Sequence, residues 1–158
     1  MNSMKNEKYQ KPFKIVGLGG TFDHLHDGHR LLLNTAAKVG EHVAIALATE
    51  KLLKNKKYHD KLEPYSSREN NLKKYLEEEL GLSPESYTII PLNDPFGIAI
   101  TDPNLEVHLS SLETHEVSLK INEERIKNGL PPMILIIIPI VNDPKGKKLS
   151  STNIRSIL

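Results

Sequence analysis

The chain has 158 residues, a length that favours a single domain with one sizeable core. Its 21 basic and 20 acidic side chains give a formal net charge of +1, which excludes both the basic surface of a general nucleic-acid binder and an acidic disordered chain. The absence of cysteine excludes disulfide scaffolds, thiol catalysis and cysteine-ligated metal sites. Polar chemistry must therefore come from oxygen ligands, lysines, arginines and seven histidines.

The N-terminal end and the apolar runs predict where the protein works. Residues 1–11 are polar and lack the apolar stretch of a secretory signal. The longest unbroken apolar run, over 133–138, is far shorter than the ~20 residues that a membrane span requires. We therefore expect a cytoplasmic protein without a membrane or nucleic-acid partner, in which a flexible tail at 1–11 precedes one domain at 12–158. The sequence leaves the oligomeric state open.

Strand-like and helix-like segments alternate through the first part of the domain. Apolar, β-branched runs indicate buried strands, and apolar residues at helical spacing indicate amphipathic helices. Gly40 is a typical signal for the end of a helix, and the Ser66–Glu69 sequence resembles an N-cap followed by an acidic first turn. Strands are predicted at 13–18, 42–48 and 86–92, helices at 28–39 and about 66–80, and a helical start that becomes a loop at 51–57.

The second part of the domain continues the alternation. A short strand at 106–109, a helix at about 114–127, a strand at 133–141 and a short helix at 151–158 are predicted. The run at 133–141 is apolar on both faces, which is typical of a central parallel strand covered by helices on each side. The alternation predicts an α/β fold, a Rossmann-like doubly wound parallel sheet of about five strands with helices on both faces.

Ligands of doubly wound sheets bind beyond the carboxyl ends of the strands. The segments expected at that edge are 19–29, 49–57, 110–114 and 142–152. The first leaves a strand at Gly19–Gly20 and enters a helix near Gly28, where backbone N–H groups and the helix dipole favour an anion. His26 and His29 are three residues apart there, so both rings would lie on one face and could donate hydrogen bonds to phosphate oxygens.

Other phosphate-binding and metal-binding patterns fit this segment less well. No Gly-Lys-Ser/Thr follows, so it is not a Walker A loop, and Phe22 stands where a dinucleotide fingerprint needs its third glycine. His24, His26 and His29 could form a three-histidine zinc site, but three ligands from one turn rarely converge on a metal. We therefore predict no protein-held metal.

A second anion-binding segment is predicted near the C-terminus. Residues 145–155 follow the apolar run at 133–141 and precede the short helix. Hydroxyl groups and backbone N–H groups at a helix start, flanked by lysines and Arg155, suit phosphate oxygens. Both anion sites are expected at the same edge of the sheet.

The two predicted anion-binding segments contain motifs that resemble those of a known superfamily. Gly20-Thr21-Phe22-Asp23 followed by His26-x-Gly28-His29, together with Ser150-Ser151-Thr152-x-Ile154-Arg155, resembles the nucleotidyltransferases with T/HxGH and SSTxxR motifs. Within that superfamily the chain is most similar to the phosphopantetheine adenylyltransferases of archaeal and eukaryotic type, over nearly all of 13–158. Segments 64–69, 111–114 and 120–125 favour this member.

The resemblance implies an enzyme that transfers the adenylyl group of ATP to 4′-phosphopantetheine, giving dephospho-coenzyme A and pyrophosphate with the help of Mg²⁺. It implies that His29 contacts the α-phosphate and the leaving group, that His26 assists it, and that Lys51, or else Lys54, holds the acceptor phosphate. Thr21, Lys51 and Arg68 would bind the acceptor. ATP would be bound by Gly19, Gly20, Thr21, Phe22, His29, Glu113, Thr114, Ser150, Ser151, Thr152 and Arg155.

Two alternatives stay open. One is another small adenylyl- or cytidylyltransferase, acting on nicotinamide mononucleotide or glycerol phosphate, although Lys-Lys-Leu-Ser-Ser-Thr at 147–152 favours ATP over CTP. The other is a non-catalytic nucleotide-binding or metal-binding module, against which the intact His26, His29, Ser151 and Arg155 speak. Among the other histidines, His42 and His59 are expected to be structural, and nothing in the sequence assigns a role to His108 or His115.

Overall fold

The computed structural model describes residues 10–54 and 59–141. They form one sheet of five parallel strands in the order β3-β2-β1-β4-β5. The predicted fold class, a parallel α/β sheet of Rossmann-like type, is confirmed. The strands are β1 (Phe13–Gly20), β2 (Gly40–Ala48), β3 (Tyr87–Leu92), β4 (Val107–Ser111) and β5 (Ile134–Ile138).

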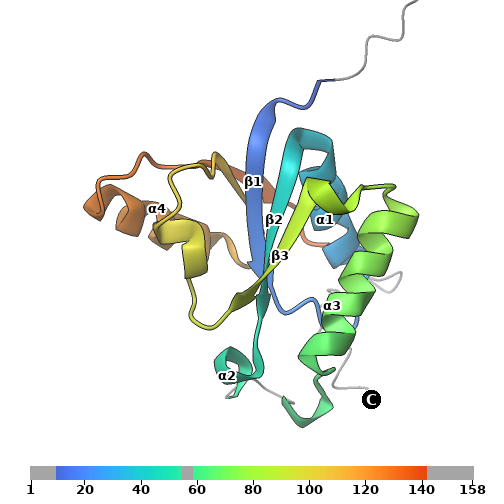
Figure 1. The fold of residues 1–158 in the computed structure, drawn as a ribbon. Helices are drawn as coiled ribbons and strands as arrows, with labels where there is room; N and C mark the ends of the chain where they lie inside the picture. Colours follow the sequence, from blue (N-terminus) through green and yellow to red (C-terminus); the bar gives the residue numbers. More distant parts are fainter. Residues whose placement is uncertain (1–9, 55–58, 142–158) are drawn as a thin grey trace, which may run out of the picture.

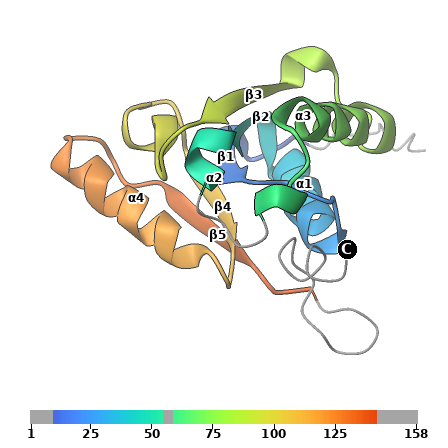
Figure 2. The same ribbon diagram turned by 90° about the horizontal axis from the view of Figure 1, so that it is seen from below.

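The helices cover both faces of the sheet. Helices α1 and α3 lie on one side and α4 lies on the other, while α2 lies at the carboxyl ends of the strands (Figures 1 and 2). The helices are α1 (Asp27–Val39), α2 (Glu50–Leu53), α3 (Tyr65–Lys74) and α4 (His115–Lys127). Short turns at His59–Lys61, Pro84–Ser86 and Gly97–Ile100 are 3₁₀-helical, and a π-helical turn at Tyr75–Glu79 prolongs α3. No helix within these ranges is long and apolar enough to cross a bilayer.

Large and small side chains alternate along β1 and β2, two of the inner strands. In β2, Val43, Ile45 and Leu47 are at most 1% exposed and belong to the main core, while Ala44 and Ala46 occupy the other face. Successive side chains of a strand point to opposite faces, so the alternation gives the sheet one bulky face and one shallow face. In β1, Val16 and Leu18 lie in the same main core, and the two residues between and after them are Gly17 and Gly19.

The prediction that residues 133–141 form a central strand is wrong. Among the described strands β5 lies at the edge, paired only with β4, and Ile134 is 55% exposed. The strand at the centre is β1, which pairs with both β2 and β4. An apolar run shows that a strand can be buried on both faces, but strand order depends on pairings distant in the sequence, which the run does not encode.

The helix predicted at about 66–80 is present, but its predicted N-cap is wrong. The helix begins at Tyr65, with Pro64 as its N-cap, rather than at a cap formed by Ser66. The Glu50 carboxylate from α2 accepts a hydrogen bond from the Tyr65 backbone N–H at 2.8 Å, so a side chain fifteen positions away satisfies one of the free N–H groups of the first turn. Gly81, at φ +67°, follows the π-helical turn and ends the segment, as predicted.

Candidate active site

The loop between β1 and α1 lies at the carboxyl edge of the sheet. Gly20 at the end of β1 pairs with Leu47, so β1 and β2 end side by side. Phe22 and His24 follow with φ values of +49° and +48°, in the left-handed region that residues other than glycine rarely adopt. Backbone held in this way needs support from its surroundings.

That support comes from the segment before α3. The Asp23 side chain is fully buried, and its carboxylate accepts a hydrogen bond from the Glu63 backbone N–H at 2.9 Å. The Glu63 carboxylate in turn accepts one from the His24 backbone N–H at 2.7 Å. This reciprocal pair of bonds, which we call the Asp23–Glu63 lock, joins two segments 40 residues apart and fixes the loop.

Arg68 lies beneath the same loop. Its side chain is 0% exposed, and Nη1 donates hydrogen bonds to the carbonyls of Thr21 and Ala48 at 3.0 and 2.7 Å, while Nε donates to the Glu63 carbonyl at 2.9 Å. Burial lowers the pKa of Arg68 from its ordinary value, and the charge of Glu50 opposes that shift. Arg68 therefore joins the ends of β1 and β2. Nη2, 3.9 Å from a Glu50 oxygen, is the nitrogen of Arg68 without a hydrogen-bond partner, and the acceptor contact predicted for Arg68 stays a prediction.

His26 and His29 come together as their spacing predicts. His26 is the N-cap of α1, its Nδ1 accepting from the Gly28 N–H at 3.0 Å, and Nδ1 of His29 accepts from the His26 N–H at 3.3 Å. The rings stack with centroids 3.8 Å apart. Since each Nδ1 accepts a hydrogen bond, the proton of each neutral ring is on Nε2. The cap therefore prepares two N–H donors at a helix N-terminus.

The surroundings act on the protonation of His26 and hold the pair in place. Burial lowers the pKa of His26, and the nearby positive charge of Arg30 lowers it further. The Phe22 ring packs against His29 with centroids 5.3 Å apart and is 1% exposed, so any contact of Phe22 with ATP would come from its backbone. Neutral imidazoles can donate to phosphate oxygens without first being protonated.

The segment after β4 reaches the same edge. Burial and the charge of Arg30 lower the pKa of His26, and the negative charges of Asp27 and Glu113 oppose that shift. Glu113 follows β4, which ends at Ser111. Thr114 is the N-cap of α4, and its hydroxyl accepts a hydrogen bond from the Ser111 N–H at 3.2 Å. The structure thus brings the predicted residues Thr21, His29, Glu113 and Thr114 to one edge of the sheet.

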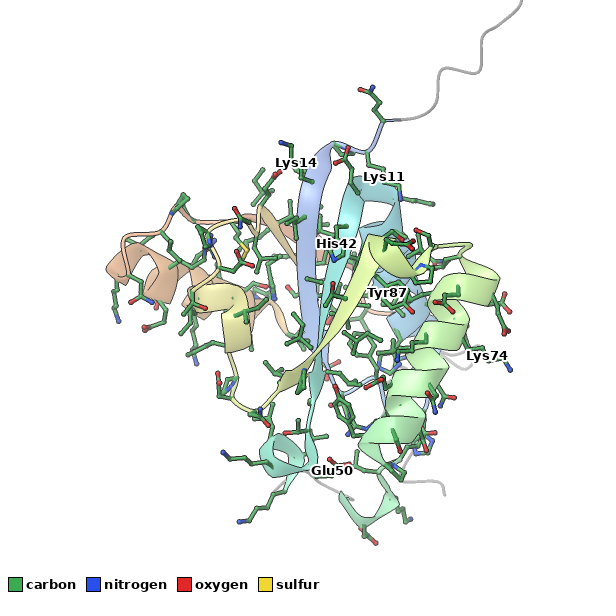
Figure 3. The ribbon with its side chains drawn as sticks, viewed as in Figure 1. Lys11, Lys14, His42, Glu50, Lys74 and Tyr87 are labelled. Atoms are coloured by element: carbon green, nitrogen blue, oxygen red, sulfur yellow. The ribbon has the colours of Figure 1, made fainter. Side chains whose placement is uncertain are left out.

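The two candidate lysines lie on and just after α2. Lys51 and Lys54 are both exposed, and the Thr49 hydroxyl before them donates to the Asn93 side chain at 2.9 Å, which ties the start of α2 to the end of β3. The positive charge of Lys51 contributes to lowering the pKa of Asp94, after two backbone hydrogen bonds. Glu50 lies at this end of the molecule, whereas Lys11 and Lys14 lie at the opposite end (Figure 3). Lys51 is therefore at the expected edge.

An apolar cavity of about 300 Å³ opens beside the loop, on the shallow face of the sheet. Its floor is formed by the small residues Gly17, Gly19, Ala44 and Ala46, and its walls include Phe96, Ile98, Leu105 and Val117, with His108, Ser110, Thr21 and Thr114 as polar members. Sequence reasoning missed this cavity. The signal was the alternation of large and small residues over 16–19 in β1 and 43–47 in β2, which leaves part of one face unfilled.

The three-histidine zinc site is not assembled in the described part of the chain. The group of metal-binding side chains that does gather there consists of Asp23, His24 and Glu63, and its carboxylates already accept the backbone hydrogen bonds of the lock. The ring of His24 lies 3.2 Å from the Lys61 carbonyl, whereas His26 and His29 form the stacked pair. Among the predicted ATP-binding residues, Ser150, Ser151, Thr152 and Arg155 lie outside the described residues.

A parallel sheet with a pair of capping histidines at the N-terminus of the first helix defines a nucleotidyltransferase-type site. Comparison with known proteins agrees, since the profile of the Cytidylyltransferase-like family matches residues 18–157. The solved structure of a protein of unknown function from Archaeoglobus fulgidus superposes with a TM-score of 0.69 at 28% identity, covering 80% of this chain and 98% of that one.

Two relatives identify a narrower group within this family. A phosphopantetheine adenylyltransferase from Pyrobaculum aerophilum is 42% identical over 147 residues, which cover 92% of each chain. A protein of the same name from Methanopyrus kandleri is 37% identical, covering 90% of this chain and 89% of its own. The chain therefore belongs to the Cytidylyltransferase-like family and, within it, to the phosphopantetheine adenylyltransferases, which confirms the resemblance seen in the motifs.

Proposed function

We propose that this enzyme transfers the adenylyl group of ATP to 4′-phosphopantetheine, releasing pyrophosphate and forming dephospho-coenzyme A. The observation that carries the proposal is the stacked His26–His29 pair at the α1 N-terminus beside an apolar cavity, in a chain 42% identical to a relative of that name. The site offers a place for phosphates and, next to it, a place for an apolar arm.

The histidine pair would act on the α-phosphate. An oxygen of the acceptor phosphate attacks the α-phosphorus, the bond to the bridging oxygen of the β-phosphate breaks, and pyrophosphate leaves with that electron pair. Negative charge on the oxygens is then met by the Nε2–H donors of His26 and His29 and by the positive end of the α1 dipole. Because the cap fixes the rings, the donors need no reorganisation during the reaction.

The cavity would hold the acceptor arm. 4′-Phosphopantetheine has a phosphate at one end of a chain whose aliphatic parts prefer apolar walls. The cavity runs from Thr21, at the loop, to Leu105 and to Ile121 of α4. Lys51, just beyond the end of β2, would then approach the phosphate end as a cation. This placement leaves the edge between α1 and α4, near Glu113, for ATP.

Mg²⁺ would enter as part of the nucleotide substrate. The Asp23–His24–Glu63 group does not fit a resident magnesium ion, because its carboxylates accept backbone hydrogen bonds and Mg²⁺ demands octahedral oxygen coordination. Mg²⁺ bound through ATP phosphates suits a site of this kind.

Pyrophosphate release tests the function. Purified protein with Mg²⁺–ATP and 4′-phosphopantetheine should release pyrophosphate and form dephospho-coenzyme A in equal amounts. Parallel reactions replace ATP by CTP, and the acceptor by nicotinamide mononucleotide or glycerol 3-phosphate. Release with one of these pairs, and none with ATP and 4′-phosphopantetheine, would move the assignment to another nucleotidyltransferase.

A further inference from the structure

A chain of three buried polar side chains lies between β4 and α4. Nδ1 of His108 is 2.6 Å from the Ser118 hydroxyl, and that hydroxyl donates a hydrogen bond to Ser110 at 2.9 Å. All three side chains are at most 8% exposed. His108 and Ser110 also line the cavity, whose other walls are mainly apolar. The proposed transfer mechanism gives no role to these three residues.

The hydrogen bonds determine which nitrogen of His108 carries the proton. Since the Ser118 hydroxyl proton goes to Ser110, the Ser118 oxygen is left to accept from His108, so Nδ1 is the protonated nitrogen. The ring has no charged partner, and burial lowers the pKa of His108 to about 4, which keeps it neutral. Nε2 therefore carries a lone pair and acts as an acceptor.

The His108 ring lines the cavity, and with Nδ1 bonded to Ser118, Nε2 is the ring nitrogen left for that space. Among the described residues, Arg68 Nη2 is the one sealed side-chain nitrogen or oxygen without a hydrogen-bond partner, so Nε2 of His108 is not sealed. The space that His108 lines is the cavity. A buried acceptor in an apolar cavity gains most from a ligand that brings an N–H donor, because the alternative is an unsatisfied polar atom or a trapped water.

We propose that His108 is a specificity-determining residue that accepts a hydrogen bond from an amide N–H of the acceptor arm. Ser118 and Ser110 act as positioning residues that hold the ring in the tautomer with Nε2 bare. The inference rests on the proposed function, because an arm with amide groups must enter the cavity. It goes beyond that function by naming the group in the cavity that distinguishes such an arm from a purely aliphatic one.

The test pairs enzyme variants with modified acceptors. The KM for 4′-phosphopantetheine should rise about tenfold in His108→Leu, the scale of one lost hydrogen bond in an apolar site, while the KM for ATP stays within about twofold. An acceptor methylated at the contacted amide nitrogen should show a similar penalty with the wild-type enzyme and none with His108→Leu. His108→Gln, which keeps an acceptor atom at similar reach, should recover part of the loss.

A matched control comes from the other end of the sheet. His42 also contacts a hydroxyl, with Nε2 2.7 Å from Thr88 Oγ1, but it does not line the cavity. His42→Leu should leave the acceptor KM unchanged. On the unmodified protein, ¹⁵N NMR of the imidazole should show His108 protonated at Nδ1 alone, a readout that does not depend on how any variant folds.

The outcomes separate the two proposals. Equal methylation penalties in the wild type and in His108→Leu, for every amide of the arm, overturn the role of His108 while leaving the transferase assignment intact. Protonation of His108 at Nε2 in the free protein overturns it as well. A wild-type enzyme that turns over a different acceptor and not 4′-phosphopantetheine overturns the proposed function, and this inference with it.

Discussion

At the scale of single residues, the N-terminus of α1 uses one side-chain type for two purposes. His26 and His29 satisfy backbone N–H groups through Nδ1, a task usually performed by serine, threonine or aspartate. An imidazole has a second nitrogen, so the same residues retain an N–H donor after capping. An aspartate cap would have repelled the phosphates that the dipole attracts.

Replacing His29 should therefore affect turnover far more than folding. For His29→Ala we expect kcat to fall at least ~100-fold, the usual scale for removing a donor to developing negative charge. Pyrophosphate release under saturating substrates measures the change. His42→Ala removes a histidine far from the loop and should leave kcat unchanged. Near-normal turnover in His29→Ala would contradict the role given to the pair.

His108 should make the protein sensitive to acid. Its pKa of about 4 in the folded protein lies below the ordinary value of 6.5, so between those values the unfolded chain binds a proton that the folded chain does not. The stability from this group is present above pH 6.5 and falls as the pH drops toward 4, by up to about 3 kcal/mol. Urea unfolding at several pH values measures this loss.

The comparison with His108→Leu isolates the effect, because carboxylates titrate in the same range. The variant has no imidazole at this position, so its unfolding free energy should fall less steeply between pH 6.5 and 4 than that of the wild type. Parallel pH profiles for the two proteins would show that His108 titrates normally in the folded state.

At the scale of elements, the Asp23–Glu63 lock connects the loop after β1 to the start of α3. The loop holds Phe22 and His24 at positive φ, and the lock supplies the bonds that make this conformation stable. The same loop leads into the capping histidines. Local backbone geometry, the lock and the direction of the histidine N–H donors are therefore coupled.

Glu63→Ala tests that coupling. Without its carboxylate the His24 N–H loses its partner, so we expect the unfolding free energy to fall by about 1 kcal/mol and kcat to fall about tenfold as the loop samples other conformations. Glu69→Ala is the matched control, because its carboxylate pairs with Lys73, four positions further along α3, and takes no part in the lock. Glu69→Ala should leave kcat unchanged, and an equal loss in both variants would refute the coupling.

The sequence predicts the elements better than their arrangement. The loop at 19–29 and the meeting of His26 with His29 are encoded by neighbours within a few positions, so motif reasoning finds them. The cap of α3 by Glu50 was missed because it depends on α2 packing beside α3, and the edge position of β5 was missed because strand order is set by distant pairings. Whether the apolar run at 133–141 is central cannot be decided from its own composition.

At the scale of the whole molecule, the two faces of the sheet differ, because one is filled by the main core and the other borders the cavity. The bulky face packs against α1 and α3 in the main core, whereas the shallow face, under α4 and the turn at Gly97–Ile100, keeps space for a ligand. The cavity exists only when both layers are assembled. The cavity therefore could not be predicted from any single segment of the sequence, although the pattern of small residues was present in β1 and β2.

Substitutions on opposite faces of β2 should have opposite consequences. Ala46→Leu would extend into the cavity, so we expect the acceptor KM to rise at least ~tenfold while the unfolding free energy changes by less than about 1.5 kcal/mol. Ile45→Val removes a methyl group from the core, and should cost about 1 kcal/mol with little change in KM. Steady-state kinetics and urea unfolding of both variants provide the measurements. If Ala46→Leu raised the KM for ATP instead of the KM for the acceptor, the cavity would be assigned to the nucleotide.

Arg68 and Arg125 both bond to backbone carbonyls, and this affects which substitutions the sequence around them can accept. Arg68 bonds to the carbonyls of Thr21, Ala48 and Glu63, and Arg125 to those of Ala99, Asp102 and Pro131. Every amino acid supplies a backbone carbonyl, so the partners of these arginines can change identity without losing the bond. Arg68 and Arg125 can thus preserve the shape of the site while the amino acids of the segments that they bind are substituted.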